Sequence, residues 1–287
     1  MPSPVWPAPE KAMPPVPAQT VRMAAGHQML WMAALANVPL PMAIMSAPLP
    51  QAAPAPAPFF AGRDRAGDAD RWSADGWLHL RRDGRAGLAT GAAPATYGAS
   101  QAGAVLRYRL APQSAARPVA YLRTSAALGR VREREIAAGV SARPFGELPV
   151  IAAAELRVSE HAGEQRVRPA LLAVTQVPPF DLPLEARGEI HAQAGYVGGK
   201  AATLFADGQI RIDRQVAAMG MAEVRAGGGS WAGAQEGAWR IDAGPGASVR
   251  VPLGASGAAR LDVDWRLRVA GNAEPESGPA VTLSAGF

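Results

Sequence analysis

Histidine, serine and the acidic residues are the side chains with which this sequence could do chemistry, and their spacing gives an enzyme little support. The four histidines are His27, His79, His161 and His191. No two of them lie three to five residues apart and there is no HExxH motif, so a zinc site has no sequence support. No G-x-S-x-G motif is present for a serine nucleophile.

Two histidines still have acidic neighbours. His191 shares the parity of Glu189, and His161 lies between Glu160 and Glu164 in a segment expected to form an outer loop. Either could act as a general acid or base, or simply hydrogen-bond within a polar wall. We expect no catalytic residues, no metal and no cofactor. A barrel hydrolase stays open as an alternative function, and it would lose activity on changing His161, His191 or an acidic residue of the outer loop.

The only extensive chemical pattern is a charged face on which arginines alternate with carboxylates. Guanidinium groups bind carboxylates and phosphates in a planar, bidentate manner, so this face could bind acidic solutes. Its members are Arg107, Arg109, Arg143, Arg157, Arg168, Arg187, Arg211, Arg240, Arg250, Arg266 and Arg268, interleaved with Glu155, Glu185, Glu189, His191, Asp213, Asp242, Asp262 and Asp264.

The elements that carry this face begin after a change in composition. Residues 1–60 hold 14 of the 27 prolines. Residues 1–70 are therefore expected to be a Pro/Ala-rich, largely disordered segment, which is either an atypical secretory signal or a linker. The chain has no Cys, which excludes disulfides and thiolate metal sites. The formal net charge is +5, but no arginine run is interleaved with aromatics, so we expect no nucleic acid as partner.

Residues 76–287 show apolar residues at every second position, which is typical of β-strands. In ARLDVDWRLRVAG, Leu261, Val263 and Trp265 share one face and Asp262 and Asp264 the other. The stretch around Gly244-Pro245-Gly246 keeps one parity and is predicted to be a single strand. Twelve strands are predicted, at about 76–83, 101–111, 118–129, 133–144, 148–160, 165–177, 184–197, 204–216, 220–232, 237–253, 259–270 and 279–287.

An even number of strands with short connections predicts an antiparallel transmembrane β-barrel that spans residues 76–287. Its apolar face is rich in Ala and Val, which suits lipid better than the close packing of a protein core. The charged face would then line the lumen. A soluble periplasmic or extracellular β-sandwich that binds a ligand is the alternative from another class.

Aromatic residues at the strand ends fit the interfacial girdles of such a barrel. Tyr108 and Phe287 are expected near the periplasmic ends, and Tyr196 and Trp239 near the outer ends. Trp77 and Trp231 instead share parity with polar neighbours, and the face of Tyr121 and Arg123 stays unassigned.

The ending PAVTLSAGF, with Val281, Leu283 and Phe287 on one parity, resembles the C-terminal assembly signal of outer-membrane β-barrels. The stretches QAGYVGG, GSWAGAQEGAWRIDAGPG and DWRLRVAGNAEPESGPAVTLSAGF resemble the C-terminal barrels of outer-membrane proteins that serve exopolysaccharide export and bacteriophage adsorption. The resemblance implies a place in the bacterial outer membrane, with outer-membrane lipid and the barrel-assembly machinery as partners. It also implies an envelope saccharide or another protein as a further partner.

Two interpretations of the lumen stay open. In one, arginines and carboxylates pair and fill a narrow barrel, because buried charges must be paired or hydrated. In the other, surplus arginine makes a conduit that favours anions. The expected role is a narrow channel, export or attachment, linked to saccharides or small anionic solutes.

Overall fold

The alternating segments form strands in the computed structural model, which describes residues 71–81, 100–128, 134–145, 148–161, 164–199, 202–253 and 257–287. The predicted signal or linker at 1–70 lies outside these residues. No helix among the described residues is long and apolar enough to cross a membrane. The strands are β1 (Trp72–Arg81), β2 (Gln101–Arg109), β3 (Val119–Ala127), β4 (Arg134–Ala142), β5 (Val150–His161), β6 (Glu164–Thr175), β7 (Phe180–Leu182), β8 (Ala186–Val197), β9 (Thr203–Met219), β10 (Ala222–Gln235), β11 (Ala238–Leu253), β12 (Gly257–Gly271) and β13 (Gly278–Gly286).

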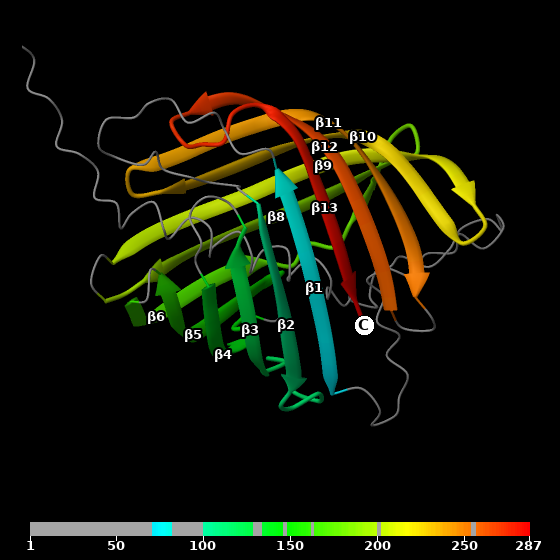
Figure 1. Ribbon diagram of the computed structural model, residues 1–287. Helices are drawn as coiled ribbons and strands as arrows, with labels where there is room; N and C mark the ends of the chain where they lie inside the picture. Colours follow the sequence, from blue (N-terminus) through cyan, green and yellow to red (C-terminus); the bar gives the residue numbers. More distant parts are fainter. Residues whose placement is uncertain are drawn as a thin grey trace, which may run out of the picture.

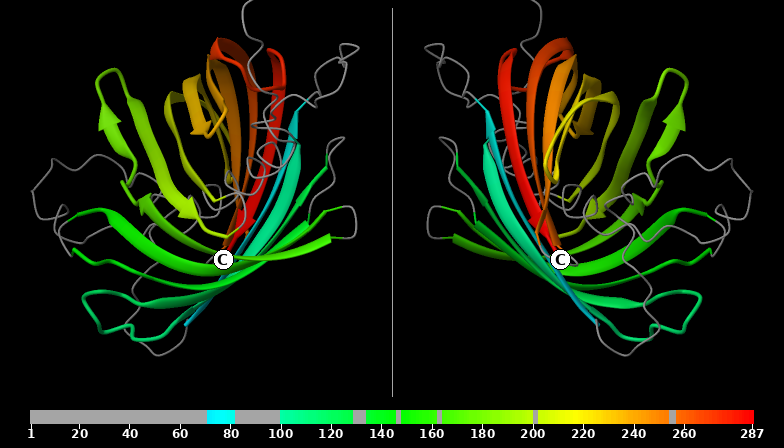
Figure 2. Two further views of the ribbon diagram at one scale, coloured as in Figure 1. Left: turned by 90° about the vertical axis from the view of Figure 1, so that its left-hand side faces the viewer. Right: turned by 90° about the vertical axis from the view of Figure 1, so that its right-hand side faces the viewer.

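Pairing between the first and last strands closes the sheet into a barrel. Each long strand pairs antiparallel with its sequence neighbour, β1 pairs with β13, and β6 pairs with β8. The result is the predicted closed antiparallel barrel of 12 strands, with the short β7 as an addition beside β8. The strands on opposite walls cross at a steep angle (Figure 1), as the tilt of a closed barrel requires. Both side views show β13 and β1 next to each other (Figure 2).

The barrel is apolar outside and charged inside, the reverse of a soluble protein. On β12, Asp264 is 2% exposed while the next residue, Trp265, is 52% exposed. Leu267 and Val263 also lie on the outside, at 48% and 47%. In water, this outer face would be a large exposed apolar surface, which soluble monomers rarely have. In lipid, a closed barrel satisfies every backbone group and keeps the apolar side chains in hydrocarbon. These faces contradict the alternative of a soluble β-sandwich.

Aromatic side chains lie on the outer face near both rims. At the rim that holds the C-terminus, called here the C-terminal rim, the rings of Trp72 and Tyr108 lie 4.8 Å apart and Phe287 is 65% exposed. Tyr196 and Trp239 are exposed near the opposite rim, at 44% and 45%. The strand was predicted to begin at residue 76, but β1 begins at Trp72. Trp72 was therefore not predicted to belong to a strand. The predicted end of that strand at 82–83 lies outside the described residues.

The Gly244-Pro245-Gly246 segment lies within one strand, β11, as predicted. Pro245 is tolerated because it lies where pairing with β12 is interrupted. The register there passes from Ala243 opposite Leu267 directly to Gly246 opposite Asp264. On its other side Pro245 lies opposite Gly228 of β10. The short β7 was not predicted, because a strand of three residues is too short to show an alternation of apolar and polar side chains.

Candidate functional site

The lumen is the candidate functional site, since it holds nearly all the buried charge of the described chain. One group, called here the wall cluster, joins the neighbouring strands β3, β4 and β5. The Arg123 guanidinium donates to Glu135 at 2.6 Å and to Glu155 at 2.9 Å. Arg157 donates to Glu155 at 2.5 Å, and the Tyr121 hydroxyl donates to the same carboxylate at 2.9 Å. Arg123 is 1% exposed. Two guanidiniums therefore meet two carboxylates, and the cluster is formally neutral.

A second group connects strands that are not neighbours, and its ion pairs are called here the cross-lumen pairs. In the first, Arg260 of β12 bonds Glu189 of β8 at 2.9 Å, although three strands lie between them in the sheet. In the second, Arg211 of β9 bonds Asp264 of β12 at 2.7 Å, with two strands between. These side chains leave their own walls and meet within the lumen, so they restrict any path along the barrel.

Trp231 shares the parity of the polar residues because its side chain lies inside the lumen, beneath the arginines of this region. It is 6% exposed. The Arg266 guanidinium stacks on its indole at 4.3 Å and that of Arg211 at 5.8 Å. Such stacking stabilises a guanidinium that has left water. Trp77, the other tryptophan on the polar parity, is likewise buried on the inner face.

Glycines on the inner faces of β10 and β11 make room for this group. A Cβ at Gly246 would lie 2.2 Å from Asp264 Oδ1 and 3.3 Å from Arg211 Nη1. A Cβ at Gly229 would lie 2.9 Å from the Trp231 ring. The register runs unbroken through Gly227–Gly229, and the irregularity of β10 lies between Val224 and Arg225. The glycine run is therefore a recess in the wall rather than a bulge.

A third group, called here the mouth cluster, lies at the rim opposite the C-terminus. The guanidinium of Arg81 from β1 bonds Asp242 of β11 at 2.8 Å. Arg240 donates to the same carboxylate through Nε, at 2.9 Å. Arg268 lies beside them and donates to the backbone carbonyl of Ala273 at 3.3 Å. Three guanidiniums thus surround one carboxylate.

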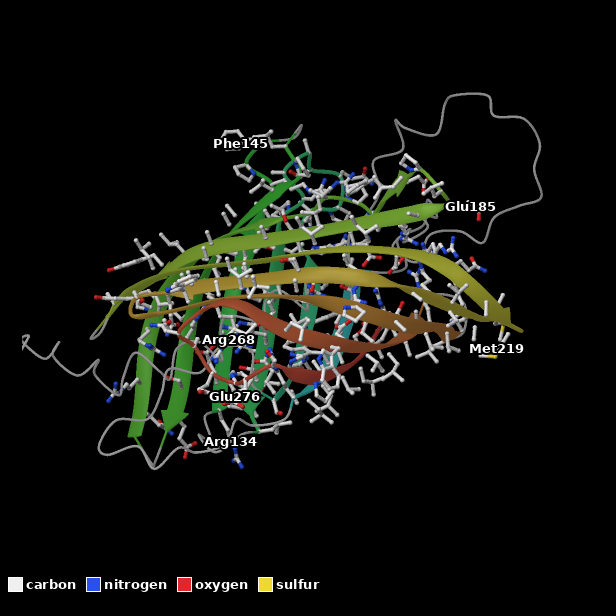
Figure 3. All side chains as sticks on the ribbon, turned by 90° about the horizontal axis from the view of Figure 1, so that it is seen from above. Arg134, Phe145, Glu185, Met219, Arg268 and Glu276 are labelled. Carbon is white, nitrogen blue, oxygen red and sulfur yellow. The ribbon has the colours of Figure 1, made fainter. Side chains whose placement is uncertain are left out.

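The loop from Asn272 to Ser277, which joins β12 to β13, folds onto the mouth cluster. Arg240 donates to the carbonyls of Ala273 (3.1 Å) and Pro275, and Arg81 donates to that of Glu276 at 3.1 Å. Ala273 is 0% exposed. Figure 3 shows Arg268 and Glu276 near each other at this end, far from Met219 at the tip of the β9–β10 hairpin. The loop therefore covers the cluster from the rim.

The two described histidine side chains are buried in the inner wall. His79 Nδ1 lies 2.8 Å from the Thr282 hydroxyl. His191 lies between Glu189 and Gln193 on the inner face of β8, and Gln193 bonds Asp207 at 2.8 Å. His161 ends β5, and its backbone pairs with that of Glu164, the first residue of β6. The predicted outer loop is therefore limited to residues 162–163, which lie outside the described residues. Within the described ranges, no three His, Asp or Glu residues are grouped to hold a metal ion.

Most predicted lumen residues lie on the inner parity of their strands. These are Arg107, Arg157, Arg168, Arg187, Glu189, His191, Arg211, Arg240, Asp242, Arg250, Asp262, Asp264, Arg266 and Arg268. Of these, Arg107 is only partly buried and pairs with Asp75.

Three predicted residues lie at the C-terminal rim instead, where strands end earlier than the parity suggested. Arg109 is exposed at the end of β2, and Glu185 is exposed in the turn before β8. Arg143 follows the end of β4 and donates to Gln176 at 2.5 Å. The pKa of Arg143 is lowered by partial burial and by the nearby positive charge of Arg117.

Several inner charges were missed, and the alternation could have found only some of them. Arg123 and Glu135 were left out because neither flanking run was long enough to fix the face of β3 and β4. Asp75 was missed because the predicted strand began at residue 76, whereas β1 begins at Trp72. Arg225 and Arg260 follow the same period-two pattern as their neighbours and lie near Asp213 and Glu189.

No family model and no curated protein matches this chain. Solved structures with a similar arrangement are outer-membrane proteins. The β domain of a Bordetella autotransporter is 9% identical with a TM-score of 0.41, covering 75% of this chain and 98% of that one. A bacterial polysaccharide outer membrane secretin is 10% identical with a TM-score of 0.38, covering 75% and 97%. An outer membrane channel from Pseudomonas putida is 10% identical with a TM-score of 0.40, covering 75% and 94%.

The barrel's own faces define the class of protein. A closed sheet of 12 strands with a lipid-compatible outside, aromatic residues at both rims and a charged inside is a transmembrane β-barrel. The chain is accordingly a β-barrel of the bacterial outer membrane.

Proposed function

We propose that the barrel is a narrow conduit for small anionic solutes, including acidic saccharides, whose lumen is narrowed by the cross-lumen pairs. The supporting observation is that arginines outnumber carboxylates on the inner face while several of them reach across it. A passing anion could exchange with the carboxylates that these arginines hold. Planar guanidiniums bind carboxylate and phosphate groups through two parallel hydrogen bonds, and rings of Arg favour anions in other pores.

Conductance in planar lipid bilayers tests this proposal. The full chain is inserted, and the reversal potential is measured across a potassium chloride gradient. We expect a small conductance, with a reversal potential of the sign that marks anion preference. Addition of glucuronate should reduce the conductance. Cation preference, or no conductance from barrels that show a boiled-versus-unboiled mobility shift, would contradict it.

We also propose that β13 is the strand recognised by the barrel-assembly machinery. Phe287 lies on the outer face with Leu283, and the backbone of Phe287 pairs with that of Ala74. An outward aromatic side chain at a strand end is accessible before the barrel closes. Deletion of Phe287 should reduce the amount of folded barrel in outer membranes, whereas refolding of the purified chain into detergent should proceed. Normal membrane levels of the deletion variant would contradict this role.

A further inference from the structure

Charge is unevenly matched in the lumen, and the mouth cluster is where positive charge exceeds negative. The wall cluster has a carboxylate for each guanidinium. In the mouth cluster, Arg81 and Arg240 share the single carboxylate of Asp242, and Arg268 bonds a carbonyl instead. The remaining acceptors are loop carbonyls, which carry a dipole rather than a charge. A full negative charge placed there would be attracted more strongly than they are.

Unsatisfied polar atoms at the same place indicate capacity for a ligand. Among the described residues, Arg81 Nε and Arg266 Nε are buried donors without a hydrogen-bond acceptor. Buried donors are nearly always bonded in folded proteins, so each of these two guanidiniums can take a further acceptor. They point toward an acceptor with several oxygens.

The covering loop has an unsatisfied group of its own. Glu274 Oε2 is buried without a hydrogen-bond partner among the described residues. Burying a carboxylate oxygen without a donor costs free energy. Outward movement of the loop would return this oxygen to water, so the closed position is less stable than its hydrogen bonds alone suggest.

We propose that Arg81, Arg240 and Arg268 form an oxyanion-binding site for carboxylate or phosphate groups, and that residues 272–277 are a displaceable plug occupying it. The carbonyls of Ala273, Pro275 and Glu276 stand where the oxygens of the anion bind. Binding of the anion and inward packing of the loop exclude each other. This inference deepens the proposed conduit and rests on it, because it makes the site the entrance of that path.

A single cysteine reports the position of the loop directly, since the natural chain has none. Ala273→Cys places a thiol at a fully buried position of the loop. The full-length variant in detergent is labelled with a charged maleimide, with inorganic phosphate, with glucuronate, or with sodium chloride at equal ionic strength. We expect phosphate or glucuronate to speed labelling about fivefold or more, in a saturable manner. The more effective anion identifies which oxyanion the site prefers.

Matched variants separate displacement from general loosening. Glu236→Cys, on the exposed neighbouring turn, should label at one rate in every solution. Arg268→Gln combined with Ala273→Cys should label quickly without phosphate and lose the dependence on it. Equal acceleration by sodium chloride would overturn the proposal, as would no acceleration by any anion.

Direct binding gives a second measurement that does not need the cysteine. A variant in which two glycines replace residues 273–276 lacks the competing carbonyls, so calorimetry should show phosphate binding about fivefold tighter or more than in the natural chain. Arg81→Gln in that background should abolish binding, with folding checked by the mobility shift. Unchanged phosphate affinity in the shortened variant would overturn the plug. An anion current without the labelling and calorimetry responses would contradict the plug and support the conduit. The labelling and calorimetry responses without an anion current would support the plug and contradict the conduit.

Discussion

The wall cluster and the cross-lumen pairs use the same residue types for different ends. Arg123, Glu135 and Glu155 join strands that are neighbours or next neighbours, so their bonds run along one wall. Arg211 and Asp264 lie on strands with two others between them. The first arrangement joins strands of one wall, and the second joins strands across the lumen. Strand separation, rather than residue type, therefore decides whether a buried ion pair in this barrel runs along one wall or across the lumen.

Removing the centre of the wall cluster should have the largest effect on stability. Arg123→Gln leaves Glu135 and Glu155 without their main counter-charge in a buried position. Breaking a buried pair from one side costs about 3–5 kcal/mol. The measurement is urea-dependent folding into lipid vesicles. Arg268→Gln is the matched control, because it removes a bond to a carbonyl only and should cost less. Equal losses in the two variants would erase the distinction between the groups.

A methyl group at the glycine recess should have an intermediate effect. Gly246→Ala puts its Cβ against the Asp264 carboxylate, which must shift from Arg211. Overpacking of this kind costs about 1–3 kcal/mol. Gly278→Ala is the control, since a Cβ there meets nothing within 4 Å. The same urea titration should separate the two. If both alanine variants behave alike, the recess is not needed for the cross-lumen pairs.

Removing both members of a cross-lumen pair should change stability least and conductance most. Arg211→Gln with Asp264→Asn removes one positive and one negative charge. Asp262 keeps its pair with Arg260, and Arg266 keeps its stacking on Trp231. Such double replacements are close to neutral, within about 1 kcal/mol. Because the pair restricts the lumen, single-channel conductance should rise. Arg123→Gln with Glu155→Gln should leave conductance as it is. A rise in the wall variant instead would reverse the assignment of the two groups.

The 12 barrel strands and most of their two faces could be predicted from the sequence alone. Apolar and polar residues alternate with period two, and this period is set locally by the backbone of a strand. The single strand through Gly244-Pro245-Gly246 could be predicted for the same reason, as could the inner position of Asp264 and Arg266. Where the alternating run was short, as around Tyr121 and Arg123, the face could not be assigned from the sequence.

Which charges meet, and what covers them, depends on contacts between strands that are far apart in the sequence. The pairing of Arg260 with Glu189 depends on closure, because only a closed barrel turns β8 and β12 toward each other. The inward packing of residues 272–277 depends on three arginines from three strands, which no local pattern brings together. The ends of strands, and with them the positions of Arg109 and Arg143, depend on where a neighbour stops pairing. Local periodicity fixes the direction of a side chain, while its partner is fixed by contacts between strands distant in sequence.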